Sequence, residues 1–387
     1  GAETGRLEMS SLRFPPNDLR KTSAHQTMLL SAALEASGSL VLPKETTGVF
    51  VGYGCDPEIA RWGARWRTRS WGEALGADEA WIEGAADAFA MPLEAAHVVG
   101  CLPNIPANRL SSQLDLRGPS HTVSSEELSG IHALGLAIDA LRRGDIDAAL
   151  VGAVDLSCEP VHRAARGVEV VADAAVVLVL RRREDAETEG LRILGEIDVG
   201  ACDATSFVSG LPPAHAAVGL VEVVGALLHT ARARRPEQSA WTDSERRLAV
   251  HVEALGGECA SVEVLSRGAP VPPLPDPPEV PSLALPAHPP DVVLPTLAWA
   301  MVPQPRMHIM RPAPALPPTS LDGPSAPPAR SASAPSARAA VGPRPAHIAP
   351  HAAIAAPVAA VAVSAQASQT APSADLHRAG WLATHTE

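Results

Sequence analysis

Apolar positions follow two periodicities over the first 267 residues. The three- and four-residue spacing that gives a helix one apolar face covers residues 17–36, 58–100, 129–143 and 215–232. Short runs rich in β-branched residues, the pattern of buried strands, cover residues 47–53, 147–154, 174–180, 192–199 and 260–265. Helical and extended segments alternate without a repeat of fixed length, so the pattern predicts α/β layers.

Two details of this pattern make definite predictions. The segment between residues 180 and 192 is charged, and it predicts a turn that joins two neighbouring strands. Four tryptophans lie in the long helical region, at Trp62, Trp66, Trp71 and Trp81. Because aromatic side chains carry large apolar surfaces, we interpret these four as core residues.

Proline divides the chain into two parts. Of the 38 prolines, 26 lie between residues 268 and 387, which leaves 12 for residues 1–267. A segment of Pro, Ala and Ser has too few large apolar side chains to offset the entropy of ordering. The sequence therefore predicts a folded region over residues 1–267, in which 260–265 is the last strand. It predicts a disordered linker over 268–373. Residues 374–387 are predicted to be the helical start of a following segment.

Charge and hydropathy exclude some classes of partner. The net charge of −12 falls entirely in residues 1–267, since the remainder holds six basic and six acidic residues. An acidic body disfavours nucleic acid and anionic membranes as partners. No window has the roughly 18 apolar residues of a membrane span, and no signal sequence opens the chain. We expect a cytoplasmic protein, and, because the chain begins with Gly, a piece of a longer one.

The cysteine pattern indicates no metal or redox motif. The five cysteines, Cys55, Cys101, Cys158, Cys202 and Cys259, stand more than forty positions apart. That spacing lacks the close pairs of zinc sites and CxxC motifs, so we interpret them as reduced, mostly buried thiols. The 14 histidines include no HExxH pair, and no Gly-rich phosphate loop is present. No metal site or nucleotide cofactor is predicted.

The most informative segment is residues 103–130, PNIPANRLSSQLDLRGPSHTVSSEELSG. The run QLDLRGPSHTV, then a helix, then LRRGDIDAALVGAVDLS, resembles the β-ketoacyl synthase (ketosynthase) family, in which a DLxGPS stretch precedes the nucleophile. ADAAVVLVLRRREDA at 172–186 is similar to the next block of that family. The resemblance covers about residues 8–264.

The resemblance implies a thiolase-like fold. Its two similar halves pack as an α/β/α/β/α sandwich of five layers, and such domains usually dimerise. We expect the first half at about residues 1–190 and a shortened second half at about 191–267. The first strand and helix of that fold would precede residue 1, so we expect the domain to lack its first strand.

The family's nucleophile is a cysteine at a helix N-terminus, where the helix dipole favours the thiolate. In this sequence Glu127 occupies that position. A carboxylate is a weak nucleophile, so the resemblance implies that the domain's own condensing activity is lost. Residues 124–127, Ser-Ser-Glu-Glu, also fit a capping box, with Ser124 as N-cap and Glu127 reaching back to its N–H. Pocket shaping, and a chemical role for Glu127 in holding or decarboxylating a malonyl group, stay open.

The family also uses two histidines, one in HGTGT and one in GHxxxAxG. HGTGT is absent, and in LPPAHAAVGLVEVVGALL (211–228) Pro213 stands at the second histidine position. His215, two residues later, could be a shifted catalytic histidine. The interpretation that we favour is a histidine at a helix start, exposed to water.

The joint loss of cysteine and histidines is typical of chain length factors, the inactive partners of ketosynthases. Details such as VSSEELSG and GAVDLSCEPVH look most like the chain-length-factor domain of multidomain polyunsaturated fatty acid synthases. The implied partners are an active ketosynthase domain, paired with apolar elements around residues 103–143, and an acyl carrier protein that supplies the phosphopantetheine arm; no other cofactor is implied. Two alternatives stay open: a malonyl-carrier decarboxylase and a degenerate docking scaffold.

Overall fold

The computed structural model describes residues 12–38, 40–54, 56–167, 170–200, 204–237 and 239–270, together with the backbone of a strand at 358–369. Its elements, in chain order, are α1 Pro16–Arg20, α2 Ala24–Ser37, β1 Thr47–Tyr53, α3 Glu58–Leu75, α4 Glu79–Phe89, α5 Ala95–Cys101, α6 Ile105–Leu114, β2 Ser120–Val123, the 3-10 helix η1 Glu126–Leu128, α7 Ser129–Arg143, β3 Ala148–Leu156, α8 Pro160–Arg166, β4 Ala172–Arg182, α9 Arg183–Thr188, β5 Gly195–Val199, β6 Ser206–Phe207, the 3-10 helix η2 His215–Ala217, α10 Val218–Ala231, β7 Glu245–Glu253, β8 Cys259–Arg267 and β9 Val358–Gln369. Within these ranges no helix has the length and apolar content that crossing a bilayer requires.

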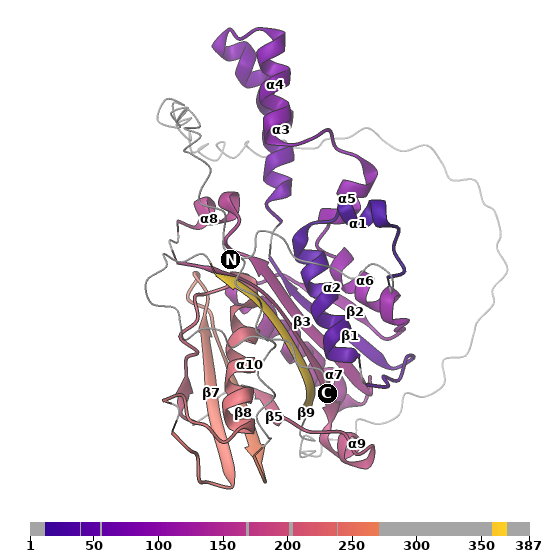
Figure 1. The fold of residues 1–387 in the computed structure, drawn as a ribbon, viewed down its shortest axis with the longest axis vertical. Coiled ribbons are helices and arrows are strands. Elements are labelled where there is room, and N and C mark those ends of the chain that lie inside the picture. The colour runs from indigo at the N-terminus through magenta and orange to yellow at the C-terminus, as the bar shows by residue number, and fades with distance from the viewer. Residues whose placement is uncertain are drawn as a thin grey trace, which may run out of the picture. The chain divides into compact units, whose positions relative to one another are not determined.

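The first half of the sheet has the order β2-β1-β3-β4 (Figure 1). Strands β2, β1 and β3 are parallel, and β4 runs antiparallel to β3. All of β1 and all but the last residue of β3 are buried. Strands covered on both faces need apolar residues at every position, which is why these two appear in the sequence as continuous apolar runs. The strand predictions at 47–53 and 147–154 are confirmed.

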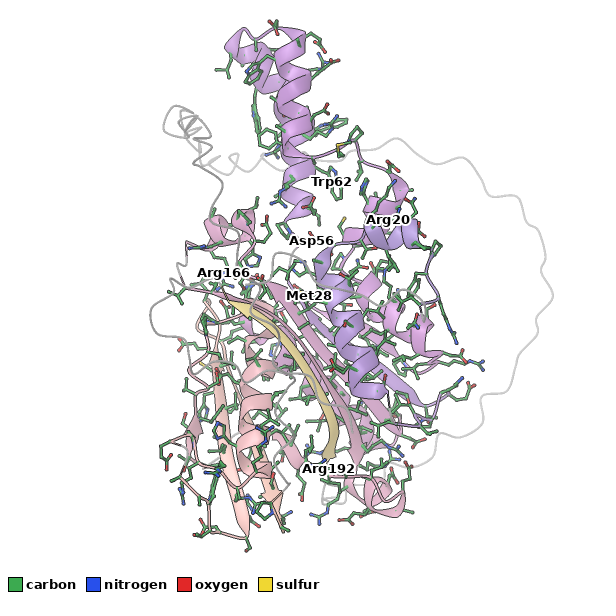
Figure 2. All side chains as sticks on the ribbon, in the orientation of Figure 1. Arg20, Met28, Asp56, Trp62, Arg166 and Arg192 are labelled. Atoms are coloured by element: carbon green, nitrogen blue, oxygen red, sulfur yellow. The ribbon has the colours of Figure 1, made fainter. Side chains whose placement is uncertain are left out.

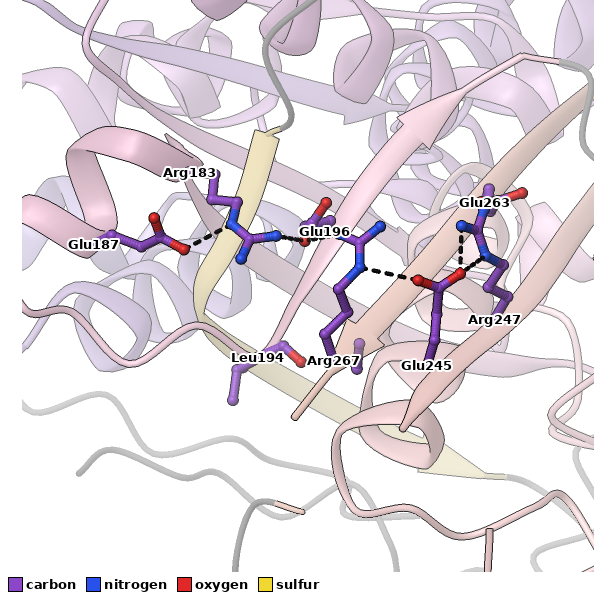
Figure 3. A network of polar contacts seen from close by, with 9 residues as sticks. Arg183, Glu187, Leu194, Glu196, Glu245, Arg247, Glu263 and Arg267 are labelled. Carbon is purple, nitrogen blue, oxygen red and sulfur yellow. Dashed lines mark hydrogen bonds and ion pairs between the residues drawn. The ribbon is translucent and has the colours of Figure 1, made fainter. Parts of the chain in front are cut away.

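The second half has the order β5-β8-β7-β6. Strand β8 confirms the prediction at 260–265, whereas β7 was not predicted. Its sequence ERRLAVHVE alternates, with Glu245, Arg247 and His251 exposed and Leu248 and Val250 buried. One face of this half is therefore charged and open to water, and its arginines and glutamates pair along it (Figure 3).

Two apolar clusters separate the layers. Helices α2 and α6 cover one face of the first half, through residues such as Leu29 and Leu110. Helices α7 and α10 lie in a second cluster that also includes Val250 and Val264 of β7 and β8. The described strands form one nine-stranded sheet whose two halves lie on either side of α7 and α10, so the order of layers is helix, half-sheet, helix, half-sheet, which confirms the thiolase-like α/β architecture. The fifth, helical layer of the expected sandwich would lie where β7 exposes its charged side chains.

Strand β9 lies between β4 and β5 and is antiparallel to both. Two predictions are wrong as a result. The strands at 174–180 and 192–199 are not neighbours, because β9 separates them, and part of the predicted linker at 268–373 is a strand. The run VAAVAVSAQASQ contains no proline, so its backbone can pair with β4 from Ala172 to Arg182. The rest of that linker beyond residue 270, and residues 374–387, lie outside the described residues.

Helices α3 and α4 pack on each other as a hairpin (Figure 1). They meet where Gly72 leaves room for Ile82: a Cβ on Gly72 would lie 2.4 Å from Ile82 Cγ1. Trp66 is 87% exposed, and Trp71 and Trp81 are about half exposed. The core interpretation is wrong for these three, because the hairpin closes through a small residue and leaves the indoles outside.

Two smaller predictions also change. The predicted helix at 17–36 is two helices, because the chain breaks at Ser23, whose N–H donates to the carbonyl of Gly100. The prediction of mostly buried thiols holds for Cys101, whereas Cys158 is half-buried and Cys259 is exposed. The remaining two cysteines lie outside the described residues.

Candidate functional site

The site lies where β2 turns into α7. The turn falls at Glu126, whose φ of 48° lies in the left-handed region that residues other than glycine rarely adopt. Helix α7 approaches β1 closely because Gly52 has no side chain: a Cβ there would lie 2.5 Å from the backbone nitrogen of Gly130. The tight turn and the close approach place Glu126 and Glu127 at the start of α7, beside η2.

The capping-box interpretation of Glu127 is wrong. Its side chain forms an ion pair with the Arg166 guanidinium, and its Oε2 accepts a hydrogen bond of 3.3 Å from the N–H of Leu255. The capping role belongs to Ser129, whose hydroxyl accepts from the N–H of Ser125 at 2.9 Å. Glu127 therefore joins three segments of the fold instead of closing its own helix. Figure 2 labels Arg166 at the end of α8.

The environment of Glu127 favours its charged form. Burial opposes ionisation, but hydrogen bonds from its own backbone N–H, from Arg166 and from the N–H of Leu255 outweigh that effect and lower the pKa of the carboxyl. At neutral pH the position therefore holds an anion that is already paired.

His215 is buried, which contradicts the interpretation of a water-exposed histidine. Only 8% of the residue is exposed. Its Nε2 lies 2.9 Å from Glu126 Oε2 and 3.9 Å from Glu127 Oε1. The structure thus places the side chain of His215 beside Glu126 and Glu127. Pro213, at the family's histidine position, contributes only its carbonyl, which accepts from the N–H of Ala172 at 3.0 Å.

Two further residues complete the cluster, and sequence analysis missed both. Asp155, at the end of β3, is fully buried and has Oδ2 3.4 Å from His215 Nδ1. His162, on α8, has Nε2 3.7 Å from Asp155 Oδ1, and its ring lies edge-on to that of His215. A carboxylate within the otherwise apolar run of β3 was the available signal. We call Glu126, Glu127, Asp155, His162, Arg166 and His215 the elbow cluster.

A third histidine lies behind the elbow cluster. His25 is buried, and its Nε2 accepts a hydrogen bond of 3.2 Å from the N–H of Leu156. Burial lowers the pKa of His25, against the opposing charges of Asp56 and Asp155. The imidazole must be neutral to accept that bond, so geometry and burial agree.

Comparison with known proteins finds a family model that matches the N-terminal part of the chain. Residues 3–168 match the model of the β-ketoacyl synthase N-terminal domain. This part of the chain is similar to the β-ketoacyl synthase family. Its ketosynthase-like domain is 30% identical over 220 residues to one subunit of the phenolphthiocerol/phthiocerol polyketide synthase of Mycobacterium tuberculosis, a match that covers 51% of this chain and 10% of the relative. It is 45% identical over 64 residues to cyclo-acetoacetyl-L-tryptophan synthase of Aspergillus oryzae, over 16% of this chain and 2% of the relative.

The fold also matches a solved ketosynthase structure. The PfaC keto synthase-chain length factor superposes with a TM-score of 0.53 at 16% identity, over 65% of this chain and 35% of that one. The chain spans a tenth or less of the length of the two curated relatives named above.

The resemblance puts Glu127 at the position where the ketosynthase family has its nucleophilic thiol. Both oxygens of this carboxylate are engaged, one by Arg166 and one by the N–H of Leu255. Cys101 is buried, and burial raises its pKa, which disfavours the thiolate. Among the described residues, this arrangement can hold charge and order the turn, and the start of α7 carries a carboxylate in place of a thiol.

Proposed function

We propose that this domain is a noncatalytic ketosynthase-like domain, of the chain-length-factor kind, in a fatty acid or polyketide-type synthase. It pairs with an active ketosynthase domain and helps to shape that domain's acyl tunnel. An acyl carrier protein brings the substrate. The noncatalytic role is more specific than the similarity to the ketosynthase family. An active enzyme would show that similarity equally well.

The observation that carries the proposal is the state of Glu127. A condensing enzyme needs a nucleophile that can accept an acyl group from a thioester. Glu127 is an ionised carboxylate tied to Arg166 and to the backbone of Leu255, so it is both a poor nucleophile and already engaged. A position that is inert but well ordered suits a domain that acts through its surface.

The free edge of β2 supports pairing with a partner. Among the described strands, β2 has β1 as its one neighbour. The N–H of Val49 donates to the carbonyl of Pro119, so by alternation His121 and Val123 face β1. The backbone groups of Ser120 and Thr122 then point outward. An open sheet edge of this kind can pair with a strand of another domain.

The similarity to PfaC supports the choice of partner. The solved PfaC structure contains a ketosynthase together with a chain length factor. At 16% identity the likeness concerns the fold alone. The PfaC structure is nevertheless named for a pair of domains of the kind that we propose.

Pairing is tested by co-expressing the chain with the active ketosynthase domain of the same synthase and measuring the dissociation constant. Thr122→Pro removes an outward N–H and should weaken binding at least tenfold, since proline cannot donate. Thr122→Val keeps the N–H and is the matched control. A wild-type chain that is folded but does not bind the ketosynthase would overturn the proposal.

Tunnel shaping is tested by product length in the assembled pair. Leu136 on α7 is 48% exposed and lies within the predicted partner face, so Leu136→Trp should shift the chain-length distribution of the products. Val41, 92% exposed and outside that face, provides Val41→Trp as the control. Binding without any shift in product length would favour the docking-scaffold alternative.

The decarboxylase alternative gains one observation from the structure. His215 lies beside Glu126 and Glu127, where a histidine could stabilise a developing enolate. The test is the intact mass of malonyl-loaded acyl carrier protein incubated with the chain, with His215→Gln and Glu127→Ala as variants. Loss of CO₂ that depends on either residue would make the domain an enzyme. An unchanged mass with folded protein fits the noncatalytic proposal.

A further inference from the structure

Three buried polar atoms of the elbow cluster face one another without a hydrogen-bond partner. They are Asp155 Oδ2, His162 Nε2 and His215 Nδ1. Their side chains are 0%, 8% and 9% exposed. A buried polar atom without a partner loses the solvation it had in water, so three together are costly unless something binds them.

The spacing of these atoms suits a small cation. One ligand atom from each residue lies within 4.8 Å of the other two. In a tetrahedral zinc site with bonds of about 2.0–2.1 Å, neighbouring ligand atoms are about 3.3 Å apart. Asp155 Oδ2 and His215 Nδ1 are 3.4 Å apart, and His162 Nε2 lies 3.7 Å from the other oxygen of Asp155. Small side-chain rotations would bring all three to bonding distance.

Neighbouring groups orient two of these ligands. His215 Nε2 lies 2.9 Å from Glu126 Oε2, so its proton belongs on Nε2 and the lone pair of Nδ1 faces Asp155. The Ser157 hydroxyl donates to Asp155 Oδ1 at 2.5 Å, which leaves Oδ2 free. Carboxylates and hydroxyls commonly hold metal ligands in this way. Asp155 Oδ2 and His215 Nδ1 then face each other as two acceptors 3.4 Å apart, an arrangement that a bound cation would stabilise.

Gly54 packs closely against the same place. A Cβ on residue 54 would lie 3.0 Å from Asp155 Oδ2 and 3.7 Å from His215 Nδ1. The lack of a side chain at Gly54 therefore lets the chain that follows β1 approach two of the unpaired atoms without displacing them.

We propose that Asp155, His162 and His215 bind one divalent transition metal ion, with zinc as the best match. Two neutral imidazoles and one carboxylate form the N₂O set of three-ligand zinc sites that keep one position open. The ion would tie the end of β3 to α8 and η2, behind the Glu127 position. The inference does not rest on the proposed function, since the metal is bound whether or not a ketosynthase partner is present.

The full chain, freed of metal with a chelator, is titrated with Co²⁺ as a spectroscopic probe and then with Zn²⁺. Binding of one Co²⁺ per chain, with the intense visible absorption of a tetrahedral site that Zn²⁺ abolishes, is expected. Asp155→Asn, His162→Gln and His215→Gln should each weaken binding at least tenfold. His251→Gln removes an exposed histidine of β7 that contacts Ser261, and should change nothing.

Two variants keep the test decisive if a ligand variant fails to fold. Glu126→Gln retains all three ligands and changes a side chain that is 72% exposed; it should weaken binding about tenfold through the orientation of His215. Gly54→Ala should weaken binding or change the absorption spectrum, because the new Cβ would lie 3.0 Å from Asp155 Oδ2 and displace that ligand atom. A folded chain that binds no Co²⁺, or one that binds it equally well with His162→Gln and His215→Gln, would overturn the inference.

Discussion

The elbow cluster and the outer face of β5, β8 and β7 are both rich in charge, and they differ in how that charge is balanced. On the outer face, glutamates and arginines alternate in one chain of ion pairs (Figure 3): Glu187, Arg183, Glu196, Arg267, Glu245, Arg247 and Glu263. Every member of this surface ladder has an opposite charge beside it, and most reach water. In the elbow cluster, by contrast, four buried side-chain atoms have no hydrogen-bond partner: Asp155 Oδ2, His162 Nε2, Arg166 Nη1 and His215 Nδ1.

The difference indicates which region is shaped by function. Exposed ion pairs change the free energy of folding little in either direction. The surface ladder is therefore what a charged sheet face in contact with water would have without any function. Buried polar atoms without partners oppose folding, and a fold that keeps them must gain elsewhere, in a ligand or a partner. Four predictions test this contrast, in order of decreasing effect.

The largest effect is expected at the close approach beneath the elbow cluster. Gly52→Ala would place a Cβ 2.5 Å from the backbone nitrogen of Gly130, and neither backbone can move without breaking the sheet or α7. We expect a loss of at least about 3 kcal/mol in the free energy of unfolding, measured with urea. Gly63→Ala, in α3 with nothing within 4 Å of the new Cβ, is the control and should stabilise by about 0.5–1 kcal/mol. Equal effects would show that the approach is not tight.

The second effect concerns the ion pair that holds Glu127. Arg166→Met leaves a largely buried carboxylate without its guanidinium and should cost about 2 kcal/mol. Glu127→Gln in the same chain should recover part of that loss, because no uncompensated charge remains. Urea unfolding of the wild type, both single variants and the double variant gives the coupling energy. Strictly additive changes would mean that Arg166 and Glu127 do not interact in solution.

The sequence predicted those parts of the fold in which a residue's own position decides its burial. Strands β1 and β3 are apolar over most of their length because both faces are covered, and their apolar runs predicted them correctly. Strand β7 was missed although Leu248 and Val250 alternate with polar residues. Strand β9 was missed because its segment has the small residues of the surrounding linker, and only pairing with β4 makes it a strand. Trp66 shows the reverse error, since its size suggested burial in a hairpin that closes at Gly72.

For the site, family motifs predicted the position of Glu127 but not its partners. Arg166 is 39 residues away along the chain and Leu255 is 128 away, and no local pattern relates them. The burial of His215 depends on η2 docking beside η1 and β3, which its helix-start sequence does not reveal. Asp155 and His162 were visible as a polar pair after an apolar strand, but their meeting with His215 is a property of the tertiary fold.

The third effect is a pH dependence set by Glu222 on α10. Burial raises the pKa of this carboxyl, against the hydrogen bonds that it accepts from the N–H and hydroxyl of Ser209, each 2.7 Å long. The pKa of Glu222 is therefore higher in the folded state than in the unfolded state, so the folded protein keeps this proton to higher pH. As a result, the free energy of unfolding should fall as pH rises from about 4.5 through the pKa of Glu222 in the folded state. Glu222→Gln, which cannot ionise, should flatten that part of the curve. A slope identical to the wild type's would show that Glu222 ionises alike in both states.

The smallest effect is expected on the surface ladder. Arg247 contacts Glu245 and Glu263, and its side chain is 44% exposed, so water and salt screen both pairs. Arg247→Gln should lower the unfolding midpoint slightly at low salt and not measurably at high salt. Arg166→Met, measured beside it, should keep most of its effect at high salt, because screening ions do not reach a buried pair as readily. If both variants lost their effect equally with salt, Glu127 would be as well solvated as the ladder, and the elbow cluster would carry no buried charge that a ligand or partner must balance.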